Sequence, residues 1–142
     1  MKHIILIALT SLTFISCGQT ESETTESKVE KKVEIYEGPQ RLERVDEMSF
    51  ISFMQENSDI QIVDVPTPEE FNDGYIPNAV NIDFKAADFK EKIDQLDKFK
   101  PVLIYCHSGG RSGKTLEMMK DMHFSTVLEL EGGYSNYITP GN

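Results

Sequence analysis

The sequence contains no tryptophan, only two cysteines and three histidines, and far fewer basic than acidic residues. Two cysteines are too few for the disulfide framework typical of small secreted domains. Fourteen Lys and Arg against 24 Asp and Glu give a formal charge of −10, whereas a nucleic-acid-binding protein needs a basic face. The histidines form no cluster with metal-ligand spacing, so we expect no metal and no cofactor. These absences leave few side chains to carry chemistry and direct attention to Cys106.

The N-terminal residues do not resemble part of a fold. An apolar stretch over residues 4–15 follows a basic residue and is short for a bilayer span, so residues 1–16 are predicted to be a signal peptide. This stretch ends at Cys17 in a pattern that resembles a bacterial lipoprotein box, with Phe14 at the position where leucine is usual. The resemblance implies cleavage before Cys17 and lipidation of its thiol. The alternative is an ordinary secretory signal with an incidental cysteine.

A lipidated Cys17 would anchor the protein in the cell envelope, on the periplasmic or outer-surface side of a membrane. Residues 17–38 are rich in Thr, Ser, Glu and Lys and bury almost nothing, so we expect a flexible acidic tether. Residues 39–142 have the length of one domain.

Within this domain, short β-branched runs alternate with helical patterns. Strands are expected at residues 41–45, 60–65, 79–82, 102–105 and 126–130. Helices are expected at residues 47–56, 68–72, 88–96 and 112–122, with a short terminal helix or turn at 134–137. Asp46 is the predicted N-cap of the first helix, and Thr67 begins a capping box with proline at the first helical position. The alternation predicts an α/β fold, with a small, mainly parallel sheet flanked by helices on both faces.

Cys106 ends the apolar strand at residues 102–105 and is followed by a glycine-containing turn that closes on Arg111. Ligands of parallel sheets bind at the carboxyl ends of the strands. There, the N–H groups of a tight turn and the positive end of a helix would favour the thiolate, which is the nucleophilic form. We therefore interpret Cys106 as a catalytic nucleophile; a buried, inert cysteine is the alternative. On an acidic protein an anion site must be local, so Arg111 and Lys114 would supply its positive charge.

Four segments, in this order, resemble the signature blocks of the rhodanese family of sulfurtransferases. They are residues 64–71, 74–82, 105–112 and 130–134, within a match of about residues 42–138. The resemblance implies a rhodanese-like fold and an enzyme in which Cys106 accepts a sulfane sulfur, becomes a persulfide and passes the sulfur to a thiol or to cyanide. The implied partners are a small anionic donor, such as thiosulfate or polysulfide, and a thiol acceptor. We expect a monomer.

The resemblance also assigns roles around the loop. The backbone of the residues after Cys106 would bind the donor, with Arg111 as a fixed cation; these substrate-binding residues are His107, Ser108, Gly109, Gly110 and Ser112. Arg111 could also form a salt bridge that braces the loop. His107 could line the loop or act as a general base. Asp64 ends a strand at the presumed edge of the site, so we interpret it as a loop-bracing acceptor; a proton shuttle is the alternative. His123 stands where the family often has glycine, and we interpret it as a left-handed residue after the helix.

Two positions depart from the family pattern. Pro66 stands where the family usually has arginine, and Tyr75 where it usually has histidine. Pro66 removes a cation and a backbone donor, so we expect a bracing contact to be lost or rebuilt there. Neither position carries the sulfur chemistry directly.

Three other functions compete for the same residues. Residues 108–115 are one residue short of a phosphate-binding P-loop, but no second metal-binding aspartate strand is evident. Cysteine phosphatases and arsenate reductases place one more residue between cysteine and arginine than Cys106 and Arg111 have between them. Domains of this fold also serve as non-catalytic binding or regulatory modules, usually without the cysteine.

Overall fold

The computed structural model describes residues 34–137. The predicted signal peptide, Cys17 and most of the predicted tether lie outside these residues. Within residues 34–137, no helix is long and apolar enough to span a bilayer. The elements in chain order are β1 (Arg41–Val45), α1 (Glu47–Glu56), β2 (Gln61–Asp64), α2 (Pro68–Asn72), β3 (Val80–Asn81), α3 (Phe89–Asp94), β4 (Val102–Tyr105), α4 (Gly110–Met119), β5 (Thr126–Leu130) and the 3₁₀ helix η1 (Gly133–Asn136).

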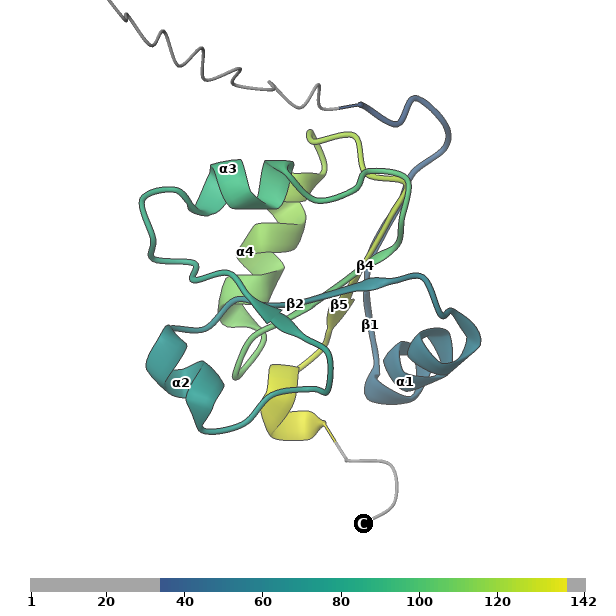
Figure 1. The fold of residues 1–142 in the computed structure, drawn as a ribbon. Coiled ribbons are helices and arrows are strands. Elements are labelled where there is room, and N and C mark those ends of the chain that lie inside the picture. Colours follow the sequence, from purple (N-terminus) through teal and green to yellow (C-terminus); the bar gives the residue numbers. More distant parts are fainter. Residues whose placement is uncertain (1–33, 138–142) are drawn as a thin grey trace, which may run out of the picture. The chain divides into compact units, whose positions relative to one another are not determined.

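The five strands form one parallel sheet in the order β1-β5-β4-β2-β3 (Figure 1). The order places β4 and β5 inside the sheet, so that both are flanked by strands on either side. All the carboxyl ends lie at one edge, because the strands run in the same direction. The predicted α/β class is confirmed, and the strand that leads to Cys106 is central in the sheet.

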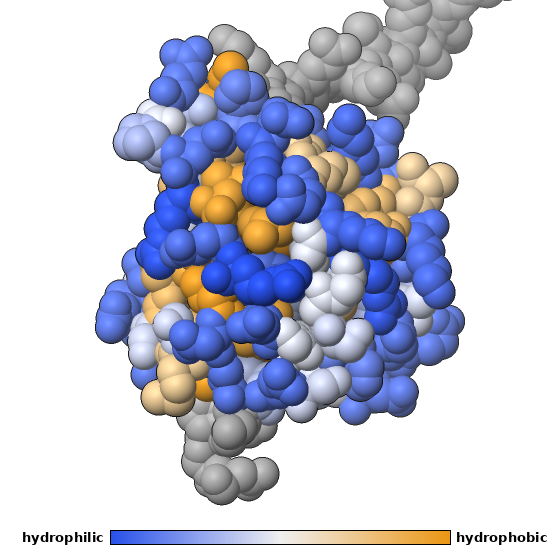
Figure 2. All heavy atoms as spheres, turned by 180° about the vertical axis from the view of Figure 1, so that it is seen from behind, coloured by the Kyte–Doolittle hydropathy of each residue, from blue (hydrophilic) through white to orange (hydrophobic). Residues whose placement is uncertain are grey.

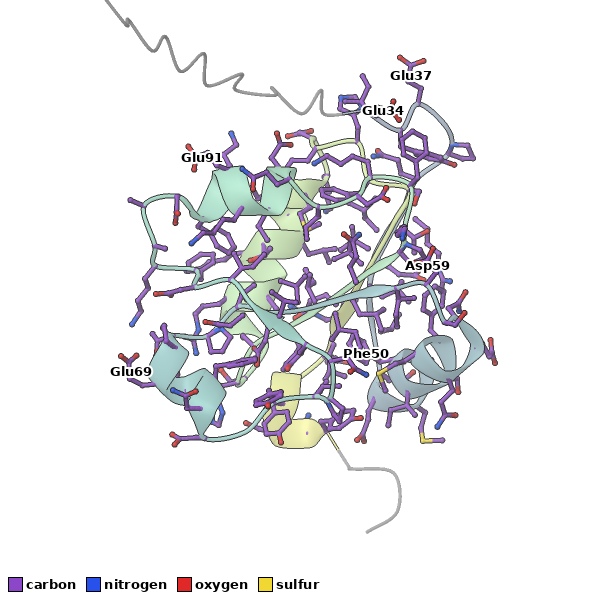
Figure 3. All side chains as sticks on the ribbon, in the orientation of Figure 1. Glu34, Glu37, Phe50, Asp59, Glu69 and Glu91 are labelled. Carbon is purple, nitrogen blue, oxygen red and sulfur yellow. The ribbon has the colours of Figure 1, made fainter. Side chains whose placement is uncertain are left out.

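Helices cover both faces of the sheet. On one face, Phe89 and Ile93 of α3 and Leu116 and Met119 of α4 pack on apolar side chains of β2, β4 and β5. On the other face, Phe50 of α1 packs with residues of the same three strands (Figure 3). Acidic side chains on the segment before β1, the loop before β2, α2 and α3 are exposed and point outward; they are Glu34, Glu37, Asp59, Glu69 and Glu91. Burial on two faces explains why β4 is an unbroken apolar run rather than an alternating one.

The predicted helix starts and stops are mostly confirmed. Asp46 Oδ1 accepts a hydrogen bond from the N–H of Ser49 at 2.9 Å, and Thr67 caps α2 in a complete capping box. His123 has φ 59°, as predicted for the left-handed residue after the last long helix. The prediction was wrong about the start of α4, which begins at Gly110 rather than at residue 112. Gly109, at φ 83°, turns the chain sharply enough for the helix to begin two residues earlier.

The surface is largely hydrophilic. Figure 2 shows one face of the molecule, on which hydrophilic residues predominate and hydrophobic ones form small groups between them. The exposed large apolar residues of the described chain come from different segments; they are Ile35, Met48, Tyr75, Val80 and Phe99. Scattered exposed apolar residues are normal on globular domains.

Candidate active site

Cys106 lies at the carboxyl end of β4, where the loop 106–109 leads into α4. The loop is hydrogen-bonded to η1. The N–H of Tyr134 donates to the carbonyl of Cys106 at 2.8 Å, and the N–H of Ser135 donates to the carbonyl of His107 at 2.9 Å. Gly133 makes this close approach possible. It has φ 66°, and a Cβ there would lie 2.2 Å from the carbonyl oxygen of Cys106. The η1 turn and the cysteine loop therefore hold each other in place.

The Cys106 side chain is buried, yet its surroundings favour the charged form. Burial alone raises the pKa of the thiol. Contacts from the Ser112 hydroxyl and from the N–H groups of Ser112, Ser108 and Arg111 outweigh burial and lower that pKa below its usual value. The early start of α4 is the reason, because it places the N–H groups of Arg111 and Ser112 in the first helical turn, where they have no intrahelical partner. The loop and the first turn of α4 thus surround the Cys106 sulfur with hydrogen-bond donors.

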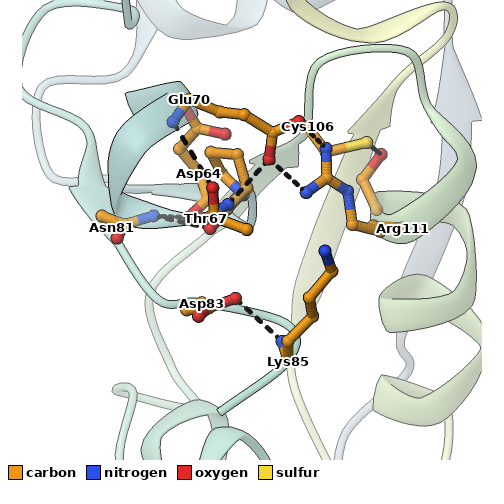
Figure 4. A network of polar contacts seen from close by, with 10 residues as sticks. Asp64, Thr67, Glu70, Asn81, Asp83, Lys85, Cys106 and Arg111 are labelled. Atoms are coloured by element: carbon orange, nitrogen blue, oxygen red, sulfur yellow. Dashed lines mark hydrogen bonds and ion pairs between the residues drawn. The ribbon is translucent and has the colours of Figure 1, made fainter. Parts of the chain in front are cut away.

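Arg111 bridges the cysteine and α2. Its guanidinium hydrogen-bonds to the Cys106 sulfur and donates two bonds to Glu70, from Nη1 to Oε2 at 2.5 Å and from Nη2 to Oε1 at 2.8 Å. Figure 4 shows the guanidinium between Glu70 and Cys106. Both roles considered for Arg111 are therefore geometrically available, since Glu70 braces the guanidinium and the same group interacts with the Cys106 sulfur. Glu70 is the N3 residue of the capping box, which fixes its position.

A second acidic residue, Glu129 of β5, lies behind the loop and was not singled out from the sequence. Its carboxylate accepts a hydrogen bond from Ser112 Oγ at 2.6 Å and forms an ion pair with Arg44 Nε of β1 at 2.5 Å. Glu129 is fully buried. The sequence did contain a hint of its role. A glutamate in the middle of a strand that is predicted to be covered on both faces needs a hydrogen-bonding or charged partner, because buried charges are otherwise unfavourable.

The other predicted loop residues differ in what they contact. The Ser108 N–H points at the sulfur, whereas the exposed His107 contacts Ser135, whose Oγ lies 3.4 Å from His107 Nε2. Gly110 is an ordinary helical residue with open space where a Cβ would stand, so of the two loop glycines only Gly109 has a left-handed φ. Lys114 is exposed on α4. Within residues 34–137, no hydrogen bond joins the His107 ring to Cys106.

Asp64 ends β2 beside Tyr105 and is buried, and its Oδ1 has no hydrogen-bond partner. Burial raises the pKa of this carboxyl to about 7, although a hydrogen bond from Tyr105 and the charge of Arg111 act in the opposite direction. No hydrogen bond recorded for residues 34–137 joins Asp64 to the cysteine loop. The bracing contact that the structure contains is made by Glu70.

We expect Asp64→Asn to stabilise the protein above about pH 7. The pKa of Asp64 is raised from 3.8 to about 7 on folding, so the stabilisation linked to its proton is complete below about pH 4 and is lost as the pH rises through 7. Asparagine does not ionise, so the gain should be about 2 kcal/mol at pH 8 and should shrink towards pH 4. Urea unfolding at several pH values measures it. A gain that is the same at pH 4 and pH 8 would show that Asp64 does not titrate in this range.

The two departures from the family pattern are accommodated locally. The carbonyls of Asp64 and Pro66 accept hydrogen bonds from Asn81 Nδ2 at 3.3 and 3.1 Å, which ties the turn after β2 to β3. Tyr75 is about half exposed and stacks on Phe71 with ring centroids 4.3 Å apart. The P-loop interpretation meets an obstacle, because Thr115, the last residue of that pattern, is buried and donates to the Arg111 carbonyl at 2.9 Å. Residues 34–137 contain no group of three or more His, Cys, Asp or Glu arranged to hold a metal ion.

Comparison with known proteins agrees with this geometry. A family model described as a rhodanese-like domain matches residues 51–139, more than half of the chain. The protein therefore belongs to the rhodanese-like domain family. The crystal structure of a rhodanese-like domain protein from Staphylococcus aureus matches with a TM-score of 0.60 and 28% identity, over 70% of this chain and 94% of that one.

Among curated proteins, the thiosulfate sulfurtransferase GlpE of Coxiella burnetii is 32% identical over 79 residues, which cover 56% of this chain and 72% of that protein. A tRNA uridine(34) hydroxylase of Cytophaga hutchinsonii is 37% identical over 87 residues, but the match spans only 28% of that protein. The chain thus has relatives named as sulfurtransferases at modest identity.

Proposed function

We propose that this protein is a sulfurtransferase in which the thiolate of Cys106 attacks the outer sulfur of an anionic donor and becomes a persulfide. The observation that carries the proposal is the convergence of donors on one sulfur atom, namely three backbone N–H groups and the Arg111 guanidinium. Such preorganised donors stabilise a thiolate and the persulfide anion that replaces it. The sulfur then passes to a thiol, or to cyanide in an assay.

The sulfur donor must be able to reach the buried Cys106 sulfur. Cys106 has no exposed surface in this structure, and the Arg111 guanidinium that contacts it is held by the half-exposed Glu70. The ion pair is partly open to solvent, with the Arg111 side chain 22% and the Glu70 side chain 41% exposed, so another anion can reach the guanidinium. An anionic donor competes with Glu70 for the guanidinium. Displacement of Glu70 by the donor would uncover the sulfur and place the cation on the donor in one movement.

The proposal is tested by weighing the intact protein after incubation with thiosulfate or polysulfide. We expect the added mass of one sulfur atom on Cys106, removable by cyanide or by a thiol. The cysteine phosphatase alternative is tested in parallel with an aryl phosphate. Phosphate release without sulfur uptake would favour a phosphatase, and neither reaction would favour a non-catalytic binding module.

We further propose that the protein is an exported lipoprotein, held on the periplasmic or outer-surface side of a membrane by a lipid on Cys17. The support is the sequence pattern before Cys17 and the acidic composition of residues 17–38. A monomeric domain on a tether suits exchange of sulfur with small soluble donors and acceptors. The Cys17→Ser variant described in the Discussion tests the anchor.

A further inference from the structure

A chain of polar contacts that is separate from the Arg111–Glu70 ion pair leads away from the reactive sulfur. Ser112 Oγ lies 3.5 Å from Cys106 Sγ and 2.6 Å from Glu129 Oε1. Glu129 Oε2 is paired with Arg44, whose side chain is 48% exposed. The contacts therefore run from the buried sulfur, through a hydroxyl and a buried carboxylate, to a guanidinium at the surface.

Among the groups of residues 34–137 that hydrogen-bond to the sulfur, Ser112 is the one that can accept a proton. The N–H groups of Ser108, Arg111 and Ser112 and the guanidinium of Arg111 are donors only. A hydroxyl can accept one hydrogen bond while it donates another. The hydroxyl can donate its single proton either to Cys106 Sγ or to Glu129 Oε1. It stabilises the thiolate when it donates to the sulfur, and it turns to the shorter contact with Glu129 when the thiol is protonated. While Cys106 is protonated, its S–H is thus left to donate to Ser112 Oγ.

We propose that Glu129 is the base that receives, through Ser112, the proton that Cys106 loses when it is loaded with sulfur. This inference rests on the proposed function of Cys106. In the loading step the S–H proton moves to Ser112 Oγ, and the hydroxyl proton of Ser112 moves to Glu129 Oε1. The sulfur forms a bond to the outer sulfur of thiosulfate, and the bond between the two sulfurs of thiosulfate breaks, so that sulfite leaves with the electron pair.

The second half-reaction reverses the proton transfer. An acceptor thiolate attacks the outer sulfur of the persulfide, and the bond between the two sulfurs breaks, so that Cys106 would leave as a thiolate. Ser112 gives its proton to that sulfur and regains one from Glu129. One proton therefore moves out and back in each cycle, and the acceptor leaves as a persulfide anion.

The electrostatics of the site support this exchange. A carboxylate and a sulfur anion buried next to each other would repel in a poorly solvated environment. Moving the proton to Glu129 as the persulfide forms keeps the number of buried negative charges constant. Charged groups from several elements face these two residues or their partners; they are Arg44 on β1, Asp64 on β2, Glu70 on α2, Arg111 on α4 and Glu131 after β5.

The test uses the full-length chain with Cys17→Ser, so that Cys106 is the only thiol. Glu129→Gln keeps an oxygen that can accept the Ser112 hydrogen bond but cannot take up a proton. Ser112→Ala also interrupts the proton path but leaves the Glu129–Arg44 ion pair intact. It therefore tests the proposal even if Glu129→Gln fails to fold. Single-turnover loading from thiosulfate is followed by intact mass over a range of pH. Alkylation of Cys106 by iodoacetamide is followed in the same way.

We expect Glu129→Gln to slow both reactions about 100-fold near pH 7, the effect typical of losing a general base. The residual rate should rise about tenfold per pH unit, because hydroxide then removes the proton. Ser112→Ala should slow both reactions to the same extent as Glu129→Gln. The double variant should be no slower than either single variant, because both substitutions interrupt the same proton-transfer path. Loading and alkylation at the parent rate and pH profile in Glu129→Gln would overturn the proposal.

Infrared difference spectra provide the direct readout. Loaded minus resting protein should show the carbonyl stretch of a protonated carboxyl, lost in Glu129→Gln and retained in Asp64→Asn, which controls for the other buried carboxyl. A band lost in Asp64→Asn instead would also overturn the relay. If the parent protein takes up no sulfur, the proposed function fails, and the alkylation profiles still decide on Glu129.

Discussion

Cys106→Ser is expected to take up no sulfur from thiosulfate or polysulfide under conditions that load the parent chain completely. A serine hydroxyl does not ionise near neutral pH, so the donors of the loop have no anion to stabilise. The fold should persist, because serine is slightly smaller than cysteine and the N–H groups that surround it can donate to its oxygen. Intact mass after incubation and release of thiocyanate on addition of cyanide measure the loss.

The matched control is Cys17→Ser, which changes the other cysteine of the chain. It should load sulfur at the parent rate, because Cys17 has no part in the proposed chemistry. Expressed with its natural N-terminus, it should also move from the membrane fraction to the soluble fraction if Cys17 carries the lipid. If sulfur uptake persisted in Cys106→Ser and disappeared in Cys17→Ser, Cys17 would be the residue that accepts sulfur, and the proposed role of Cys106 would be wrong.

Arg111→Met is expected to slow sulfur loading about 1,000-fold, at the upper end of the effect of removing one preorganised donor from an anion site. Methionine keeps much of the length of the side chain but removes the cation that contacts both the sulfur and Glu70. Without the cation the pKa of the thiol should rise. The defect should therefore be largest near pH 6 and smaller near pH 9, where thiolate forms without help. Quenched-flow loading followed by intact mass gives the rates.

Glu70→Gln separates the two roles of Arg111. It removes the anion that braces the guanidinium but keeps the cation next to the sulfur. If Arg111 acts mainly on the sulfur and the donor, this variant should load within a few-fold of the parent rate, and faster if release from Glu70 is part of donor entry. If Arg111 acts mainly as a brace, Glu70→Gln and Arg111→Met should be equally slow.

Local sequence patterns were sufficient to predict much of the architecture. The apolar run before Cys106 predicted a central strand, and the box at Thr67 predicted the start of α2, because strand burial and helix capping depend on residues close in sequence. The start of α4 was misplaced because the left-handed conformation of Gly109 does not follow from the presence of glycine alone. The same loop was still recognisable as an anion cradle, since a turn between a strand and a helix points its N–H groups inward.

The partners of the site residues could not be predicted in this way. Arg111 and Glu70 are 41 residues apart in the chain, and Arg44 and Glu129 are 85 apart. Arg44 reaches Glu129 because β1 and β5, the first and last strands within residues 34–137, pair in parallel. No local periodicity encodes that order of strands.

By itself, the sequence determined an acidic protein with an α/β domain, the family resemblance and the cysteine on which the chemistry depends. The tertiary structure alone decided that the sulfur is buried, that Glu70 holds Arg111 over it, and that Glu129 lies behind it. Pattern in a sequence reports on neighbours within a few residues, whereas these contacts exist because sheet formation brings distant segments to one edge.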